Sequence, residues 1–440
     1  MKKALFCLFF SLLICGCGNV GGDSEETNAD PTEIVVASCW PNDFLRRVAR
    51  EYNNTHDDYE IIIKEYRSFG DYVYLTEDRN NIIRDILSGE NIDIIDLCGF
   101  EYSSPSYFEL IEKGYIEDQT SYFEESEELS LDEFLDEAVA LYDYDGYLGA
   151  VTNLFGLSCY LADKDVVPTG TITVNDLIDY DLNHDDFHWP AGYNENAILR
   201  VCLYNNMNSF VDLENATCNF DNDFFRKIMD YARCYADNSQ GSDLNGEESI
   251  RPFSIDKLTD VEIALQTQFE GNAIICGLPS VDGSFRVQMT SLNGCALAIA
   301  SKSKHKDIAW NFIECCLREN PISAPHDTKE NIGTYGIPSK KEFLEDYLDI
   351  MAGKGGPLDT TYYIGDSGYT TEVTLHPLTQ DGRRKIINYI ESSQPYDLRY
   401  QPIIEIISEE VDYYFAGQKS IDDVIGMIEN RAKMYLEERR

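Results

Sequence analysis

The sequence predicts an α/β protein built on a parallel sheet with helices on both faces. Between residues 33 and 97, short runs rich in β-branched residues alternate with segments of helical periodicity. Glycines are spaced through residues 146–165, and strand-like and helix-like segments alternate again after residue 256. A β-α-β-α-β order is typical of parallel sheets, in which ligands bind beyond the carboxyl ends of the strands. The loops after Ser38 and Leu97 are therefore the first places to expect a binding site.

The first part of the chain supplies the clearest alternation. The run EIVVAS at 33–38 reads as a strand, and it is followed by a helix whose face carries Phe44, Leu45, Val48 and Tyr52. The remaining elements expected in this part are a strand at 60–64, a helix at 81–87 and a strand at 92–97. The glycines of 146–165 suggest that the chain there crosses between lobes and does not lie inside one.

The second part repeats the alternation with longer helices. An amphipathic helix at 256–269 ends at Gly271, a good helix stop. The other expected elements are strands at 273–277 and 295–300, separated by a turn-rich 279–283, and a helix at 306–318. Trp310, at helical spacing with Ile308 and Phe312, is expected to pack in the interior. Two apolar stripes near the C-terminus, on either side of Gly417, read as packing surfaces.

The N-terminus has the layout of a secretory signal. Lys2 and Lys3 precede an apolar stretch from residue 4 to 14, which is shorter than the roughly 20 residues needed to cross a bilayer. The tetrad Ile14-Cys15-Gly16-Cys17 resembles a lipobox, which implies that residues 1–16 are removed and the Cys17 thiol carries a diacylglycerol. Residues 17–32 then form a solvated tether, and the protein is held at the outer face of the cell membrane. The alternative is that Cys17 is an ordinary thiol after a simple signal.

The charge of the chain argues against some binding partners, and its cysteine spacing argues against some kinds of site. The net charge is −44, so the long-range field would repel nucleic acid and anionic lipid headgroups. Three of the 13 cysteines lie in the first 17 residues, and the others show no CxxC or CxxxH spacing. We expect most of them to be buried free thiols, and the sequence leaves open whether two of them form a disulfide. The six histidines show no metal-binding spacing, so we expect no metal and no cofactor.

Enzyme motifs are weak or missing in this sequence. Residues Gly365-Asp366-Ser367-Gly368 resemble the nucleophile loop of trypsin-like proteases, but the histidine motif of that family is missing. No phosphate-binding or dinucleotide-binding glycine motif stands between a strand and a helix. Carboxylates are so numerous that a glycosidase-like pair would occur by chance. We therefore assign no catalytic residue and expect a protein that is not an enzyme.

Several segments in order resemble the bacterial extracellular solute-binding proteins of the carbohydrate ABC-transporter type, the family 1 solute-binding lipoproteins. The segments are Trp40 after the opening strand, IIRDILSGENIDIIDL at 82–97, GYLGAVTNLFGLSCYLADKD at 146–165, FEGNAIICGLPSVDGS at 269–284, LAIASKSKHKDIAWNFIECCL at 297–317, YGIPSKKEFLE at 335–345 and the C-terminal 409–438. The chain departs from the family at Ile92, where proline is usual, and at 150–152, which also lacks the usual proline.

The resemblance implies a fold and an arrangement of domains. The expected fold is two-lobed and periplasmic-binding-protein-like (type II), with a hinge and a ligand cleft between the lobes. The first lobe would comprise 33–150 plus 293–320, and the second 151–292 plus 321–440. The expected activity is capture of a small solute, a sugar or oligosaccharide, by a monomer that hands it to the transmembrane subunits of an ABC permease. A surface-anchored glycan-active enzyme, or a sensor with the same fold, remain alternatives.

Candidate ligand-binding residues follow from the chemistry of sugars. A sugar offers flat C–H faces for aromatic rings and hydroxyls for Asp, Asn, Glu or Arg. The candidates are Trp40, Asp43, Asp96, Asn153, Phe155, Trp189, Asp282 and Tyr335. Each has an ordinary structural alternative: a packing position for Trp40, a helix cap for Asn42 and Asp43, and a turn for Asp282 with Gly283.

Overall fold

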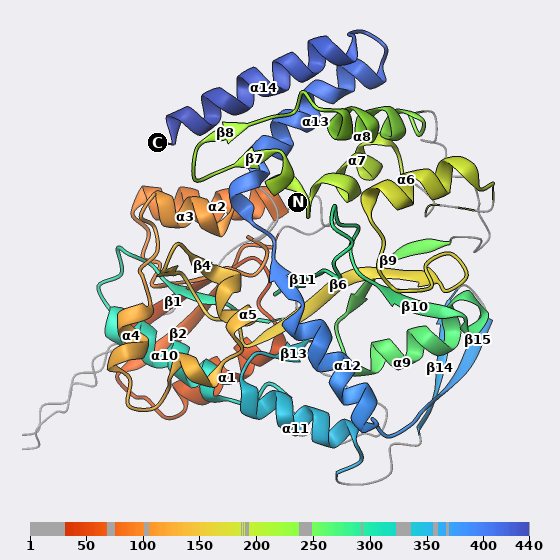
Figure 1. Cartoon of the computed structure of the whole chain (residues 1–440). Helices are drawn as coiled ribbons and strands as arrows, with labels where there is room; N and C mark the ends of the chain where they lie inside the picture. Colours follow the sequence, from red (N-terminus) through yellow and green to blue (C-terminus); the bar gives the residue numbers. More distant parts are fainter. Residues whose placement is uncertain are drawn as a thin grey trace, which may run out of the picture.

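A computed structural model of the whole chain is shown in Figure 1. It describes residues 31–67, 75–100, 105–185, 187, 189, 193–236, 249–291, 294–322, 336–354, 360–366 and 369–439. Cys17 and all but the last two residues of the expected tether lie outside these residues, as does Tyr335. Within them, no helix combines the length and the apolar character that crossing a bilayer requires.

The first lobe is built on a four-stranded sheet in the order β12-β3-β1-β2. Strands β1 (Thr32–Ser38), β2 (Tyr59–Glu65) and β3 (Ile94–Asp96) are parallel, which confirms the expected β-α-β-α-β order. Strand β12 (Leu297–Ile299) returns from far along the chain and pairs antiparallel with β3. Helices α1 (Asp43–Asn53), α2 (Leu75–Ser88) and α10 (Lys306–Arg318) accompany this sheet.

Helix α2 begins six residues before its expected start. Its first turns contain Asp78 and Arg79, which are polar yet only 2% and 3% exposed. Apolar periodicity could not reveal these turns because their buried side chains are charged.

A string of short elements continues the first lobe along the free edge of β12. Ile116 bridges Ala300, and the Glu117 amide donates to the Ile299 carbonyl at 2.9 Å. These elements are α3 (Tyr107–Glu112), α4 (Thr120–Glu125), η2 (Leu131–Glu133), α5 (Asp136–Val139), η3 (Ala140–Tyr142), β4 (Asp143–Tyr144) and β5 (Tyr147–Leu148). Both edges of β12 are therefore occupied.

The second lobe is built around one long strand, β6 (Leu154–Asp163). Strands β9 (Ile250–Ile255), β10 (Ala273–Cys276), β11 (Val287–Thr290) and β13 (Ile337–Pro338) all pair antiparallel with β6, and β16 (Ser393–Pro395) pairs parallel with β11. The reading of 146–165 as a crossing is thus wrong for its second half. Residues 154–163 form the central strand because their apolar side chains are buried on both faces.

Helices and two hairpins complete the second lobe (Figure 1). They are α6 (Val174–Asn183), α7 (Glu195–Leu203), η4 (Met207–Ser209), β7 (Val211–Asp212), β8 (Thr217–Cys218), α8 (Asp223–Arg233), α9 (Leu258–Thr267), η5 (Gln268–Gly271), α11 (Lys341–Met351), β14 (Thr360–Asp366), β15 (Tyr369–Leu375), α12 (Gln380–Glu391), η6 (Leu398–Tyr400), α13 (Gln401–Phe415) and α14 (Ile421–Glu438). The stripes on α13 and α14 are confirmed as packing surfaces, since residues such as Ile407 and Ile428 are fully buried.

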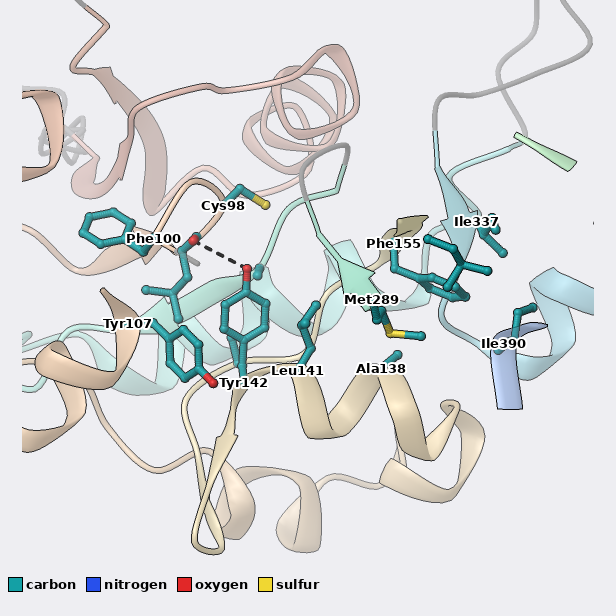
Figure 2. Packing of buried hydrophobic residues seen from close by; sticks show 14 of the residues in the cluster. Cys98, Phe100, Tyr107, Ala138, Leu141, Tyr142, Phe155, Met289, Ile337 and Ile390 are labelled. Atoms are coloured by element: carbon teal, nitrogen blue, oxygen red, sulfur yellow. Dashed lines mark hydrogen bonds between the residues drawn. The ribbon is translucent and has the colours of Figure 1, made fainter. Parts of the chain in front are cut away.

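Buried apolar side chains form a continuous layer between the two sheets. Figure 2 shows Phe100 and Tyr142 on one side, Leu141 in the middle, and Phe155 and Met289 on the other, all in one cluster. Separate clusters fill each lobe, and Trp310 belongs to that of the first lobe, as expected. All ten cysteines from Cys39 onward are free and seven of them are buried, which confirms the prediction of buried thiols.

Candidate functional site

Three segments of chain meet where the two sheets approach each other, and we call them the crossing segments: 150–153, 294–296 and 336–340. Thr152 and Ala296 form an antiparallel bridge, and the Asn153 amide donates to the Cys295 carbonyl at 3.2 Å. The third segment joins the first when the Ser339 amide donates to the Asn153 carbonyl at 3.1 Å. Residues from three distant parts of the sequence thus meet at one junction.

Asn153 and Gly294 fix the packing of this junction. The side-chain oxygen of Asn153 accepts a hydrogen bond from the Cys295 amide at 2.8 Å. A Cβ atom on Gly294 would lie only 2.5 Å from the Leu154 carbonyl oxygen, so only glycine fits there. Asn153 was expected to contact ligand, but its side chain is 4% exposed and holds the crossing segments together. Gly294 was not recognised, because a lone glycine carries no pattern in the sequence.

The carboxyl ends of β1 and β3 reach the same junction. The Ser38 hydroxyl donates to Asp96 Oδ2 at 2.7 Å, and the amides of Cys98 and Ala296 donate to Oδ1 at 3.2 and 3.4 Å. Burial raises the pKa of the Asp96 carboxyl from 3.8 to about 6, although these hydrogen bonds act in the opposite direction. Asp96 was expected at the ligand, but it lies 2% exposed and ties the two loops to a crossing segment.

A buried arginine, Arg79, donates a hydrogen bond to the loop after β3. Arg79 donates from Nη1 to the Gly99 carbonyl and from Nη2 to the Thr76 hydroxyl, the latter at 3.0 Å. Its guanidinium carbon lies 5.9 Å from the centre of the Phe100 ring. Burial lowers the pKa of this guanidinium. Arg79 was missed from the sequence because it sits in the polar start of α2.

Trp40 is the candidate ring that stays at the surface. It follows β1, is 38% exposed, and its amide donates to the Ser38 hydroxyl at 3.1 Å. The guanidinium carbon of Arg67, just after β2, lies 4.5 Å from the centre of its ring. Asp43 opens α1 nearby and is exposed, while Asn42 caps that helix by accepting from the Leu45 amide at 2.8 Å. An exposed indole with an exposed guanidinium can stack on a flat apolar face and bind hydroxyls.

Other candidates lie in the interior of the second lobe. Phe155 is fully buried in β6. Trp189 is 4% exposed, donates from Nε1 to the Tyr231 hydroxyl at 2.8 Å and stacks on Tyr193. This burial replaces the expected stacking role of Trp189 with a packing role. The sequence around it is polar, so its burial against α8 could not be foreseen.

Asp282 forms a turn. Its Oδ1 accepts from the Ser284 amide at 3.1 Å, and its carboxylate also meets Arg286. The hydrogen bonds from Ser284 lower the pKa of Asp282. Gly283, with φ of +72°, completes the turn that was the alternative reading.

Two further observations bear on where a site lies in the described part of the chain. No group of three His, Cys, Asp or Glu side chains there is placed to hold a metal ion. A hollow of about 780 Å³ opens between α9 and α12, but residues 38–43, 97–100 and the crossing segments do not line it. The junction and its neighbouring loops therefore remain the candidate site.

Several solved structures with a similar fold are described as sugar-binding or substrate-binding proteins. An ABC substrate-binding protein of Listeria monocytogenes, in complex with cycloalternan, is 14% identical, with a TM-score of 0.56 over 93% of this chain and 100% of its own. The cyclic alpha-maltosyl-1,6-maltose binding protein of Arthrobacter globiformis is 14% identical, with a TM-score of 0.55 over 93% and 100%. The sugar-binding protein MalE of Xanthomonas citri is 13% identical, with a TM-score of 0.56 over 93% and 98%.

The TM-scores, at these low identities, show a shared fold and no more. The chain has the two-lobed, periplasmic-binding-protein-like fold that the family resemblance implied. No protein-family model matches the chain, and no curated protein sequence matches it either.

Proposed function

We propose that this chain is an extracellular solute receptor that captures a sugar or oligosaccharide and delivers it to an ABC importer. The observation that carries the proposal is the two-lobed fold, which over 93% of the chain resembles a substrate-binding protein solved in complex with cycloalternan. In this proposal the protein acts by binding and not by catalysis. The crossing segments serve as the hinge.

Capture of a solute would use the loops that lie next to the crossing segments. A ligand that touches loops of both lobes stabilises the closed arrangement by its higher affinity for that arrangement. Trp40 supplies a face for a sugar ring, and Arg67 and Asp43 supply a donor and an acceptor for hydroxyls. Asp96, Asn153 and Arg79 position these loops from the interior.

A lipid on Cys17 holds the receptor near its permease. Anchoring on the membrane raises the effective concentration of the receptor at the transmembrane subunits. Replacing Cys17 with alanine in cells is expected to release the protein from the membrane fraction. A Cys17→Ala protein that stays in the membrane fraction would contradict the anchor and leave the binding proposal intact.

The binding proposal is tested with a panel of sugars. Purified protein is heated with mono- and oligosaccharides, linear and cyclic, and the unfolding temperature is recorded. A ligand that binds only the folded state raises that temperature in proportion to the logarithm of its concentration. Stabilisation by at least one saccharide, with no change in that saccharide after long incubation, supports a receptor. No stabilisation by any sugar contradicts the proposal, and release of product indicates an enzyme.

A further inference from the structure

The two lobes also touch on the side of the crossing segments away from Trp40. There the first lobe presents α3 and the β4–β5 hairpin, and the second lobe presents η6 and the end of α14. Figure 1 shows the C-terminal end of α14 close to α3. We call this contact, formed by Phe108, Glu112, Tyr144, Asp145, Arg399, Tyr435 and Arg439, the rear contact.

Arg439 makes the first half of the rear contact. Its Nη2 pairs with Glu112 Oε2 at the end of α3. Its guanidinium carbon lies 4.7 Å from the centre of the Phe108 ring and 4.9 Å from that of Tyr435. A guanidinium between two rings and a carboxylate combines cation–π attraction with an ion pair. The residue thus joins α14 of the second lobe to α3 of the first.

Arg399 makes the second half. Its Nη1 lies 3.4 Å from Asp145 Oδ1 at the tip of the β4–β5 hairpin. Asp397 holds the same guanidinium in place, accepting from Nε at 2.8 Å and from Nη2 at 2.7 Å. Tyr144 links the two halves, because its ring packs edge-on against Phe108 with centres 4.7 Å apart.

The strand order places this contact behind the hinge. In the order β12-β3-β1-β2, the crossing segments join at β3 and β12, where Asp96 meets the Ala296 amide. Trp40 and Arg67 follow β1 and β2, on one side of that point. Segment 115–119, which leads from α3 toward the hairpin, pairs along the opposite edge of β12. A rotation about the crossing segments that brings the second lobe toward Trp40 therefore separates the two sides of the rear contact.

We propose that the structure described here is the open form of the receptor and that the rear contact is a counter-latch, which stabilises this form and must separate before the lobes close on a solute. This inference rests on the proposed function, because it concerns regulation of the same binding site. A contact made only in the open state lowers the fraction of closed receptor and weakens apparent affinity by the same factor. The latch sets how much free solute is needed to close the receptor.

The test uses Arg439→Gln, Glu112→Gln and the double variant in the full chain. Both ion-pair partners are about one-third exposed, so the variants should fold normally. Removing the pair is expected to tighten binding of the sugar identified by the panel about two- to fivefold. Lys433→Gln is the matched control, because Lys433 on the same helix pairs with Glu429 of that helix at 2.9 Å. The Lys433→Gln variant should bind the sugar with the same affinity as the wild type.

Charge reversal distinguishes the effect of the Arg439–Glu112 ion pair from the effect of changing either residue alone. Exchanging the partners, as Glu112→Arg with Arg439→Glu, should return the affinity to near the wild-type value. Unchanged or weaker binding in the folded Arg439→Gln and Glu112→Gln variants would overturn the counter-latch.

A readout without ligand keeps the two proposals apart. Small-angle X-ray scattering of the ligand-free double variant should give a smaller radius of gyration than the wild type, because more receptor is closed. An equal or larger radius contradicts the counter-latch even if sugar binds. If no sugar binds the wild type, the proposed function fails, and the scattering comparison still decides whether the rear contact holds the lobes apart.

Discussion

The Arg67 guanidinium carbon lies 4.5 Å from the centre of the Trp40 ring, so the loop after β2 contacts the loop after β1. Both loops stand at the carboxyl end of the first sheet, where parallel strands usually present ligand-binding residues. The indole remains 38% exposed beside that guanidinium. Both side chains are therefore accessible to a solute.

Removing the Trp40 ring should weaken solute binding without unfolding the protein. Trp40→Ala loses a stacking face and is expected to raise the dissociation constant tenfold or more, since about 1.4 kcal/mol corresponds to a factor of ten. Trp40→Phe keeps an aromatic face and should bind within about threefold of the wild type. Titration calorimetry measures both variants, and equal affinity of Trp40→Ala and wild type would remove Trp40 from the site.

Tryptophan fluorescence should report binding through one residue. The chain has three tryptophans, and Trp189 and Trp310 are both at least 91% buried within the lobes. The emission change on adding sugar should therefore persist in Trp189→Phe and Trp310→Phe and vanish in Trp40→Phe. A change that survives in Trp40→Phe would show that the signal arises in the lobe interiors.

The crossing segments should be sensitive to one added methyl group. Gly294→Ala places Cβ 2.5 Å from the Leu154 carbonyl oxygen and should lower the free energy of unfolding by about 1–3 kcal/mol. Gly426→Ala, inside α14 with no atom within 4 Å of the new Cβ, should raise it by about 0.5–1 kcal/mol. Urea unfolding compares them, and equal effects would mean that Gly294 is not closely packed.

Asp96 should give the junction a recognisable pH dependence. Its pKa is about 6 in the folded protein against 3.8 in the unfolded chain, so its contribution to stability is full below pH 3.8 and is lost as pH rises through 6. The Asp96→Asn variant has no carboxyl at this position, so it does not lose stability through this titration. Between about pH 5 and about pH 7.5, the free energy of unfolding of the variant should improve relative to wild type by about 1–1.5 kcal/mol. A difference that does not change with pH would contradict the raised pKa.

Thiol labelling should find one fast site. Cys234 is the exposed cysteine among the ten from Cys39 onward, and Cys218 and Cys315 are half-buried. Burial raises the pKa of the Cys39 and Cys202 thiols to about 12, which leaves almost no reactive thiolate. In a chain that starts at Gly18, native protein should react quickly at about one thiol, and Cys234→Ser should lose that phase. A fast phase that remains in Cys234→Ser would place a second thiol at the surface.

The fold could be predicted where buried apolar residues recur at the spacing of a strand or a helix. The parallel strands of the first sheet and the stripes on α13 and α14 were visible because burial there is apolar. The start of α2 was missed because Asp78 and Arg79 are buried charges. The return of β12 to β3 joins residues about 200 positions apart, and local patterns do not encode such pairing.

The candidate site was only partly predictable. Asp96 and Asn153 were expected to contact ligand, and the structure places both at the junction, where their burial depends on neighbours from distant segments. Trp189 has the right chemistry for a sugar, but its indole N–H donates to the Tyr231 hydroxyl and the residue is buried in the second lobe. Residue type indicates which groups could bind, and packing decides which of them a solute can reach.

Whether the protein is a sugar receptor is decided by titration calorimetry with the saccharide that most stabilises it. We expect one site per chain and about tenfold weaker binding by Trp40→Ala, with the unfolding temperature of that variant unchanged. Absence of binding heat for every mono- and oligosaccharide in the panel, with protein shown to be folded, would contradict the proposed receptor function.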